Sequence, residues 1–117
     1  MTLIYKILPR EEWRAAEAVG VFEGSAVDVA DGFIHFSAED QMAETLRRHF
    51  AGQTDLLLVA VDAASLGAAL KWEPSRGGAL FPHLYGPLSA ALAVYAIPIK
   101  APPVQSPATP PLDGAPS

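Results

Sequence analysis

Two short segments of the sequence carry an aromatic ring, a histidine and a hydroxyl at alternate positions. They are Phe33-x-His35-x-Ser37 and Phe81-x-His83-x-Tyr85. Side chains alternate between the two faces of an extended strand, so each segment would place its three side chains on one face. An imidazole changes its charge near neutral pH and could polarise, protonate or position a ligand there. The alternative is that each histidine is buried and hydrogen-bonded only to the backbone.

The second of these segments lies in the stretch from Leu70 to Leu88, which mixes charged and aromatic side chains with glycines and prolines. Proline fixes φ and glycine permits backbone angles that other residues avoid, so we expect this stretch to have a defined, irregular backbone conformation. Arg76 beside Gly77 and Gly78 could clamp a carboxylate or a phosphate while the glycines let backbone approach the ligand. The alternative is a structural loop in which Arg76 pairs with Glu73 at the surface.

Several kinds of site are excluded by what the sequence lacks. It contains no cysteine, which excludes a disulfide framework, a thiolate metal site and a cysteine nucleophile. It also lacks the glycine-rich fingerprints of the Rossmann fold and the P-loop, and the H-E-x-x-H and G-x-S-x-G motifs. A metal site would need His35, His49 and His83 to converge with a carboxylate, and we expect His49 to face elsewhere on its helix. We therefore predict that His35 and His83 share a metal-free cleft.

Length and charge describe one acidic globular domain. The 117 residues can form a single core without metal or disulfide support, and the net charge is −5. No basic stripe is available for a phosphate backbone, which argues against nucleic acid as a partner. No apolar run approaches the ~20 residues that span a bilayer, and the N-terminus has no signal-peptide features. We expect a cytoplasmic protein that binds neither membrane nor nucleic acid.

Hydrophobic patterns indicate an α+β fold in which two helices pack on a mixed, split sheet of about six strands. The strands are expected at 3–8, 33–36, 55–61, 70–73, 80–85 and 92–99. The run from Asp55 to Val61 is apolar enough to be a central strand, buried on both faces. Pro98 puts the end of the last strand at a sheet edge or past it.

The first helix is expected from Pro9 to Val19, with Trp13 as a core anchor and Gly20 as its stop. The second is expected over 38–50, with Ser37 as its N-cap. Between these helices, residues 21–30 are expected to form a loop with a short extended piece.

The composition changes at residue 101. Six of the last seventeen residues are proline, and a segment of this kind does not bury enough apolar area to become ordered. We therefore predict a single globular domain over 1–100 and a flexible proline-rich tail over 101–117.

The quoted motifs resemble a family of small bacterial proteins, the domain of unknown function 952 family. The resemblance rests on D-G-F-I-H-F-S (31–37), on W-E-P-S-R-G-G-A-L-F-P-H-L-Y-G-P-L (72–88) and on the opening I-Y-K-I with E-E-W (4–13). It covers residues 3 to about 99. The family is placed with the ADP-ribosyltransferase superfamily, whose members bind NAD in a notch between two small sheets without a Rossmann fingerprint or a metal. The resemblance therefore implies an ADP-ribosyltransferase-like fold.

The resemblance also implies a nucleotide ligand, NAD, used as a substrate. The implied catalytic residues are His35, His83 and Glu73. The expected ligand-binding residues are Lys6, Ser37, Trp72, Ser75, Arg76, Gly77, Gly78 and Tyr85, and no metal is expected.

Two positions depart from the pattern of the family, because many relatives carry histidine in place of Lys6 and glutamate in place of Ala79. The domain is thus expected to be an active or a degenerate NAD-binding domain. The alternative is a non-enzymatic module that binds a small ligand or a protein.

Overall fold

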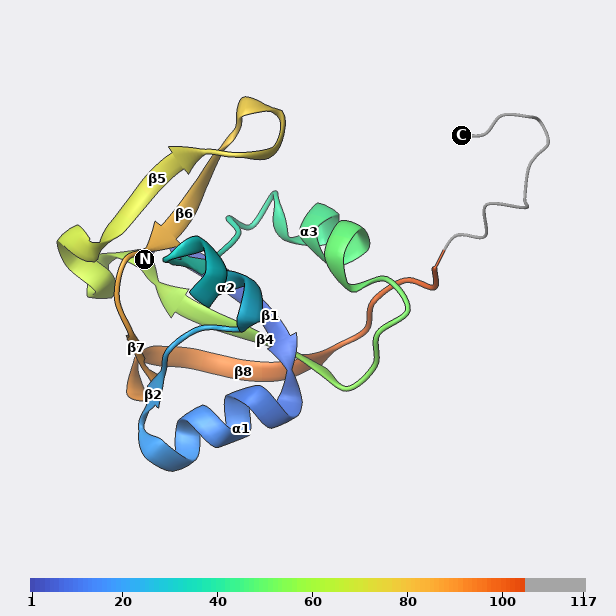
Figure 1. Ribbon diagram of the computed structural model, residues 1–117, viewed down its shortest axis with the longest axis horizontal. Coiled ribbons are helices and arrows are strands. Elements are labelled where there is room, and N and C mark those ends of the chain that lie inside the picture. The colour runs from blue at the N-terminus through green and yellow to red at the C-terminus, as the bar shows by residue number, and fades with distance from the viewer. Residues whose placement is uncertain (105–117) are drawn as a thin grey trace.

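The computed structural model describes residues 1–104, apart from the side chain of Arg76 (Figure 1). The helices are α1 (Arg10–Val19), α2 (Ala26–Asp31) and α3 (Met42–Phe50), with short 3-10 helices η1 (Ala63–Ala69), η2 (Arg76–Gly78) and η3 (Ala90–Leu92). The strands are β1 (Leu3–Pro9), β2 (Val21–Phe22), β3 (Ile34–His35), β4 (Leu56–Asp62), β5 (Leu70–Pro74), β6 (Leu80–Leu84), β7 (Leu88–Ser89) and β8 (Ala93–Ile99). The predicted flexible tail lies outside the described residues beyond Val104.

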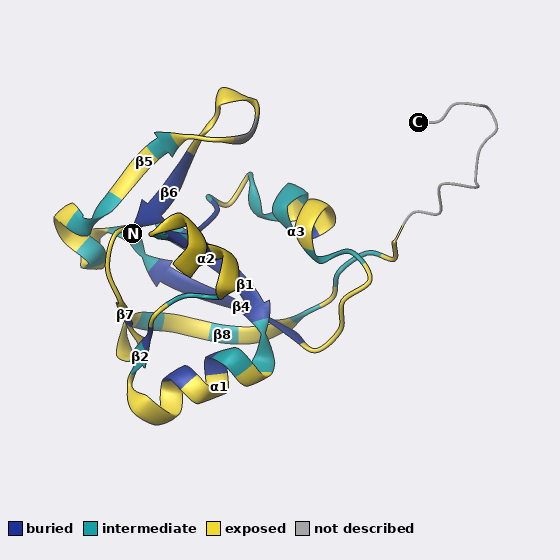
Figure 2. Ribbon diagram, in the orientation of Figure 1, coloured by how far each residue is buried: buried dark blue, intermediate teal, exposed yellow. Residues whose placement is uncertain are grey.

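The largest structural unit is a sheet of order β1-β4-β8, in which both pairings are antiparallel. β4 is the middle strand, and residues 56–61 are all buried (Figure 2). The prediction of a central apolar strand is therefore confirmed. β8 lies at the edge of this sheet, as the proline at position 98 predicts.

Two smaller sheets complete the fold, one of order β3-β6-β5 and one pairing β2 with β7. Every strand pairing within residues 1–104 is antiparallel, so the predicted mixed sheet is wrong. For β5 and β6 the physical reason is the tight turn that joins them, because a parallel neighbour needs a crossover of a dozen or more residues. The split character and the α+β class are as predicted.

The core has two parts, one on each face of the β1-β4-β8 sheet. On one face α1 contributes Trp13, whose ring meets Phe22 edge to face at a centroid distance of 6.0 Å. On the other face Leu46 of α3 packs with Ile7 and Leu58. Trp13 is thus the predicted core anchor, and the first helix ends at Gly20 in the left-handed conformation, also as predicted.

The segment 21–30 contains a helix that the sequence pattern did not suggest. Ser25 and Asp28 form a capping box at the start of α2, and Gly32 closes the helix in the left-handed conformation. α2 packs beside β3, and its Asp28 contacts Lys6 of β1. It therefore brings Asp28 to the sheet that carries His35.

Candidate functional site

The two histidines occupy directly opposite positions on β3 and β6. Opposite residues in an antiparallel pair project from the same face, and the ring centroids of His35 and His83 lie 5.6 Å apart. The ring of Phe33 contacts both imidazoles, stacked on His83 at a centroid distance of 4.1 Å and tilted against His35 at 4.5 Å. The structure thus places both imidazoles on one sheet face.

Each histidine has its own carboxylate partner, and in both cases the carboxylate is bonded to the Nδ1 atom of the ring. Nδ1 of His35 lies 2.6 Å from Oδ1 of Asp28, and Nδ1 of His83 lies 2.8 Å from Oε1 of Glu73. A carboxylate at Nδ1 requires a proton on that nitrogen and holds the ring in one orientation. Nε2 of His83 is then the nitrogen that can accept a proton or bind a ligand. The side chain of His83 is only 6% exposed, so its ring is largely shielded from water.

The second ring nitrogen of His35 meets another carboxylate. Its Nε2 lies 2.9 Å from Oδ2 of Asp31, the last residue of α2. His35 is therefore held between two acidic side chains of one short helix, while His83 has one such partner. The two imidazoles consequently have different surroundings, although they share a face.

Asp28 is the centre of the buried network and was not anticipated as a site residue. Its carboxylate, 1% exposed, accepts hydrogen bonds from the His35 backbone and ring, from the Ser25 backbone and from Nζ of Lys6. Burial alone would raise the pKa of Asp28. The bond from His35 and the ammonium of Lys6 outweigh that effect and lower the pKa to about 2. Asp28 is thus ionised at neutral pH.

Lys6, expected at the ligand, is instead bound inside the protein. Its side chain is 7% exposed and its Nζ lies 2.7 Å from Oδ2 of Asp28. Burial lowers the pKa of Lys6 more than the attraction of Asp28 raises it. The role that the structure gives Lys6 is to hold Asp28, which in turn positions His35.

Glu73 connects the second histidine to a tyrosine. Its Oε1 accepts from Nδ1 of His83 and from the hydroxyl of Tyr85, each at 2.8 Å. The bond from His83, followed by that from Tyr85, lowers the pKa of Glu73. The hydrogen bond from the Tyr85 hydroxyl to Glu73 also raises the pKa of Tyr85. The structure therefore brings together three of the predicted site residues, Glu73, His83 and Tyr85.

The pairing of β5 with β6 decides which neighbouring side chains reach this face. Lys71 lies opposite His83, whereas Trp72 lies opposite Pro82 on the next position along. Because side chains alternate, Lys71 and Glu73 share the face of His83 and Trp72 projects from the other. Trp72 is therefore separated from the site, while Lys71 supplies a cation there that the sequence interpretation left out.

Ser37 has a different role from the predicted one, and the second helix starts later than expected. α3 begins at Met42 with Gln41 as its N-cap, so the prediction of Ser37 as the cap is wrong. The backbone of Ser37 pairs with Tyr5 of β1 in both directions at 2.8 Å, which holds Ser37 extended. Its hydroxyl lies 2.8 Å from that of Thr45 and is buried. The long-range pairing of Ser37 with Tyr5 therefore outweighs the local preference of serine for a helix N-cap.

The turn between β5 and β6 contains the remaining predicted ligand residues. Ser75 donates its backbone N–H to Ala79, and Gly77 and Gly78 adopt positive φ, which suits glycine. These residues are exposed at the tip of the β5–β6 arm, beyond Glu73 (Figure 2). The side chain of Arg76 falls outside the described part of the chain.

Asp28, Asp31 and Lys71 are the polar residues that sequence reasoning missed. A signal for Asp28 was present, because Ser25 and Asp28 have the S-x-x-D spacing of a weak capping box. Within the described residues, no three histidine or acidic side chains converge so as to hold a metal ion. His49 lies exposed in the last turn of α3.

Fold and site together define an α+β domain of three small antiparallel sheets, with a carboxylate-oriented histidine pair on one of them. The pattern of the family described as "Protein of unknown function (DUF952)" matches residues 7–96, so the chain belongs to that family. A comparison with curated proteins finds no match. No helix among the described residues is long and apolar enough to cross a membrane.

Solved structures of one Caulobacter crescentus protein, CC0527, are similar to this chain. The X-ray structure is 58% identical, with a TM-score of 0.83 over 85% of this chain and 87% of that one. The solution NMR structure is 60% identical, with a TM-score of 0.76 over 84% of each chain. The arrangement of sheets and helices described above is thus shared with a bacterial relative.

Proposed function

We propose that the histidine-pair face binds NAD and that the protein is an ADP-ribosyltransferase-like domain acting in the cytoplasm. The observation that carries this proposal is the pair His35 and His83, each oriented through Nδ1 by a carboxylate, 5.6 Å apart between ring centroids. A face of this kind offers ring surfaces, an ionised carboxylate and an imidazole nitrogen within one small area. Those are the groups that a nicotinamide riboside needs.

The residues on the face suit the parts of NAD. Phe33 and Tyr85 offer rings against which the nicotinamide can stack, with their centroids 5.3 Å apart. Glu73 offers carboxylate oxygens for ribose hydroxyls, and Lys71 offers a cation for the pyrophosphate. Lys6 is paired with Asp28 and would act on the ligand only by holding His35 in place.

The reaction that fits this set is transfer of the ribosyl group. The bond between ribose C1′ and the nicotinamide nitrogen breaks, and nicotinamide leaves with the bonding electron pair. Positive charge then develops on the ribose, where the ionised Glu73 would stabilise it. An acceptor hydroxyl, amine or water forms the new bond to C1′ and gives its proton to Nε2 of His83.

The test is to mix the protein with NAD and measure released nicotinamide by chromatography. We expect Glu73→Gln and His83→Asn to lower the release by roughly a hundredfold or more, because each removes an electrostatic or proton-transfer contribution. Glu44→Gln is the matched control, since Glu44 is paired with Arg47 and Arg48 on α3 and should leave the release unchanged. Absence of both NAD binding and nicotinamide release in the unaltered protein would refute the proposal.

A second candidate is a non-enzymatic module that binds the same ligand. The observation in its favour is the buried pairing of Lys6 with Asp28, which occupies the strand position where many relatives carry histidine. Saturable NAD binding without nicotinamide release, weakened by His35→Gln and His83→Gln alike, would favour this module over the transferase.

A further inference from the structure

The outer edge of strand β8 is open. β8 ends the sheet order β1-β4-β8, and among the described residues it pairs only with β4. Its large apolar side chains are also well exposed, with Val94 at 48%, Tyr95 at 37% and Ile97 at 45% (Figure 2). An open sheet edge presents unpaired backbone N–H and C=O groups to any further strand. β8 therefore offers both hydrogen-bonding groups and apolar surface to a partner.

This edge also carries no charge. No lysine, arginine, aspartate or glutamate occurs between Arg76 and Lys100, although 18% of the chain is charged. Natural proteins often place a charged side chain, lysine above all, on an exposed edge strand to prevent pairing with other chains. β8 lacks that protection.

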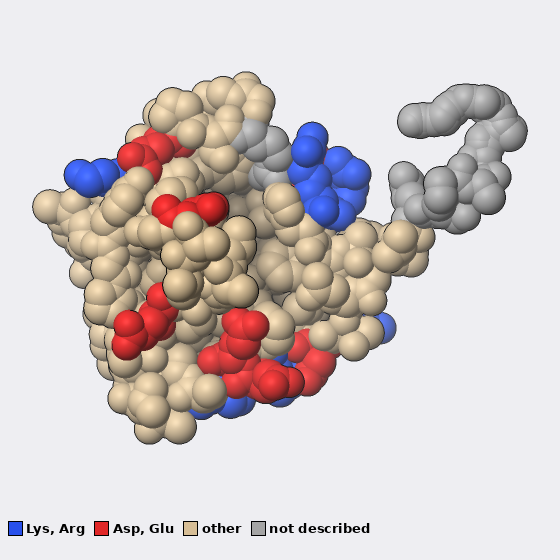
Figure 3. All heavy atoms as spheres, in the orientation of Figure 1, with Lys and Arg blue, Asp and Glu red and all other residues tan. Residues whose placement is uncertain are grey.

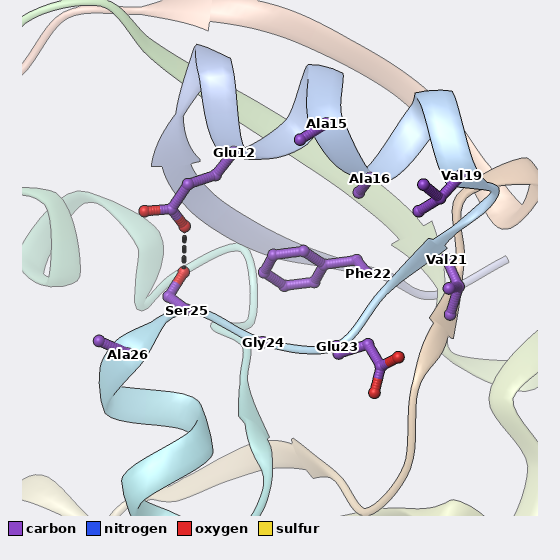
Figure 4. A pocket seen from close by; sticks show the side chains of 10 residues that line it. All are labelled: Glu12, Ala15, Ala16, Val19, Val21, Phe22, Glu23, Gly24, Ser25 and Ala26. Carbon is purple, nitrogen blue, oxygen red and sulfur yellow. Dashed lines mark hydrogen bonds between the residues drawn. The ribbon is translucent and has the colours of Figure 1, made fainter.

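The side of the molecule that carries α1 and α2 is less suited to self-association. Acidic side chains gather beside the start of α1 (Figure 3), and Glu12 and Glu23 line the hollow of about 430 Å³ between α1 and α2 (Figure 4). Two copies of a chain with a net charge of −5 would repel each other there. The neutral edge of β8 allows two copies to approach without such repulsion.

Pro98 indicates which residues of β8 direct their backbone groups outward. Proline has no N–H to donate, and in an edge strand it lies where that side of the backbone faces away from the ladder. Residues two apart in a strand direct their N–H and C=O groups to the same side, so those of Ala96 also face outward. Val94 is passed over in the pairing with β4, where the register shifts between Ala60 and Val61. The proline and this bulge limit the open edge to a short segment centred on Ala96.

We propose that two copies of the chain pair edge to edge through β8, antiparallel and about a twofold axis at Ala96. The N–H of each Ala96 donates to the Ala96 carbonyl of the other copy. The two three-stranded sheets then form one continuous sheet. The pairing is independent of the histidine-pair face, which belongs to the β3-β6-β5 sheet.

The side chains of β8 are self-complementary in this register. Tyr95 of one copy lies opposite Ile97 of the other, and the twofold axis produces this pair twice. Both side chains project from the same sheet face, because the residues lie two apart. A cross-strand pair of an aromatic and a β-branched side chain is a favourable one, and the small Ala96 meets only itself at the axis. A second copy of β8 thus fits this edge, with apolar side chains matched and no charge opposed.

The test is sedimentation velocity of the full chain over about two decades of concentration. We expect a reversible dimer whose fraction rises with concentration. Tyr95→Lys and Ile97→Glu should each weaken it about tenfold or more, because each alters both cross-strand pairs and adds charge to the edge. The matched controls, Val29→Lys on α2 and Val19→Glu on α1, make the same changes of charge at exposed apolar positions and should leave the dimer unchanged.

An equal mixture of the two β8 variants tests the register. In the mixed dimer the introduced lysine lies opposite the introduced glutamate, and the second cross-strand pair is the native one of Ile97 with Tyr95. The mixture should therefore recover a dimer that neither variant forms alone. A measurement without substitutions is amide hydrogen exchange, which should slow at Ala96 as the concentration rises, because this N–H is bonded only in the dimer.

The proposal is supported if both β8 variants, shown to be folded by circular dichroism, lose the dimer and the mixture recovers it. A chain that stays monomeric at every concentration would overturn it, as would a dimer that the β8 variants leave intact. Equal weakening by the two controls would mean that net charge alone governs association and would also overturn it. So would exchange at Ala96 that does not depend on concentration, or a mixture of folded variants that recovers no dimer, since either excludes the axis at Ala96.

Discussion

Replacing Asp28 by asparagine should be among the most damaging single changes in the protein. The carboxylate is 1% exposed and accepts from Lys6, from the ring and backbone of His35 and from the Ser25 backbone. Asparagine has one acceptor oxygen and no charge, so the ammonium of Lys6 would remain buried without a counter-charge. Breaking a buried pair in this way costs about 3–5 kcal/mol. That is a large fraction of the 5–15 kcal/mol by which a domain of this size is stable.

The partner substitution should cost less. In Lys6→Met the charge is removed and an apolar side chain of similar length remains, while Asp28 keeps its bonds to His35 and Ser25. We expect about 1–3 kcal/mol, the cost of leaving a buried acceptor partly unsatisfied. The double variant, Lys6→Met with Asp28→Asn, has no buried ammonium that lacks a counter-charge. Its loss of stability should therefore be smaller than the sum of the two single losses by about 1–3 kcal/mol.

The assay is urea unfolding followed by circular dichroism at pH 7, analysed as a two-state transition. The expected result is a larger loss for Asp28→Asn than for Lys6→Met, with the loss of the double variant below the sum of the two single losses. Equal losses for the two single variants, or a strictly additive double variant, would refute the view that Asp28 is the centre of the network and that the pair acts as a unit.

The pH dependence gives an independent check on the same carboxyl. Its folded pKa is about 2 against an ordinary value of 3.8, so it contributes about 2 kcal/mol of stability above pH 4. Because the folded pKa is the lower one, the unfolded chain takes up the proton first. The contribution is therefore fully present above about pH 4 and is lost as the pH falls from about 4 through 2. Asp28→Asn should remove this part of the acid sensitivity.

Three further predictions concern other parts of the chain. Removing residues 101–117 should lower the free energy of unfolding, measured in urea, by about 0.5–1.5 kcal/mol more than removing residues 105–117 does. The reason is that the carbonyl of Pro102 accepts a hydrogen bond from the backbone of Gly52, in the loop after α3, and that Ala101 packs against the core. Equal losses would contradict this prediction. Glu73→Gln should lower the pKa of Tyr85, since the bond to the carboxylate raises it, and spectrophotometric titration of the tyrosines should show one midpoint moving down. Leu88→Ala, at a fully buried position, should cost about 2–5 kcal/mol, and a loss below 1 kcal/mol would mean that the β2-β7 pair contributes little to the core.

The sequence was informative where a pattern repeats locally. The repeated aromatic-x-His-x-hydroxyl spacing correctly predicted that His35 and His83 share one face. Glu73 reaches that face because its strand, β5, pairs with β6. The same alternation separates Trp72 from these residues.

What could not be predicted depends on contacts between distant parts of the chain. Ser37 has the residue type of a helix cap, but its pairing with Tyr5 in β1 keeps it extended. Asp28 lies in a helix whose valines are exposed and whose aspartate is buried, against the rule by which apolar faces are recognised. The partner of that aspartate, Lys6, is distant in sequence and adjacent only once β1 and α2 have packed.

The order of strands in the β1-β4-β8 sheet has a consequence for how the chain is made in the cell. β4 pairs with a strand from the beginning of the chain and with one that ends at Ile99, so the sheet is completed only when nearly the whole domain has left the ribosome. Until then one edge of a fully apolar strand has open hydrogen-bonding groups, a form that invites pairing with other chains. Chains released early by a stop codon or by ribosome stalling before Ala93 would expose that edge permanently. Formation of β8, the last strand in the chain, is therefore the step that covers the open edge of β4.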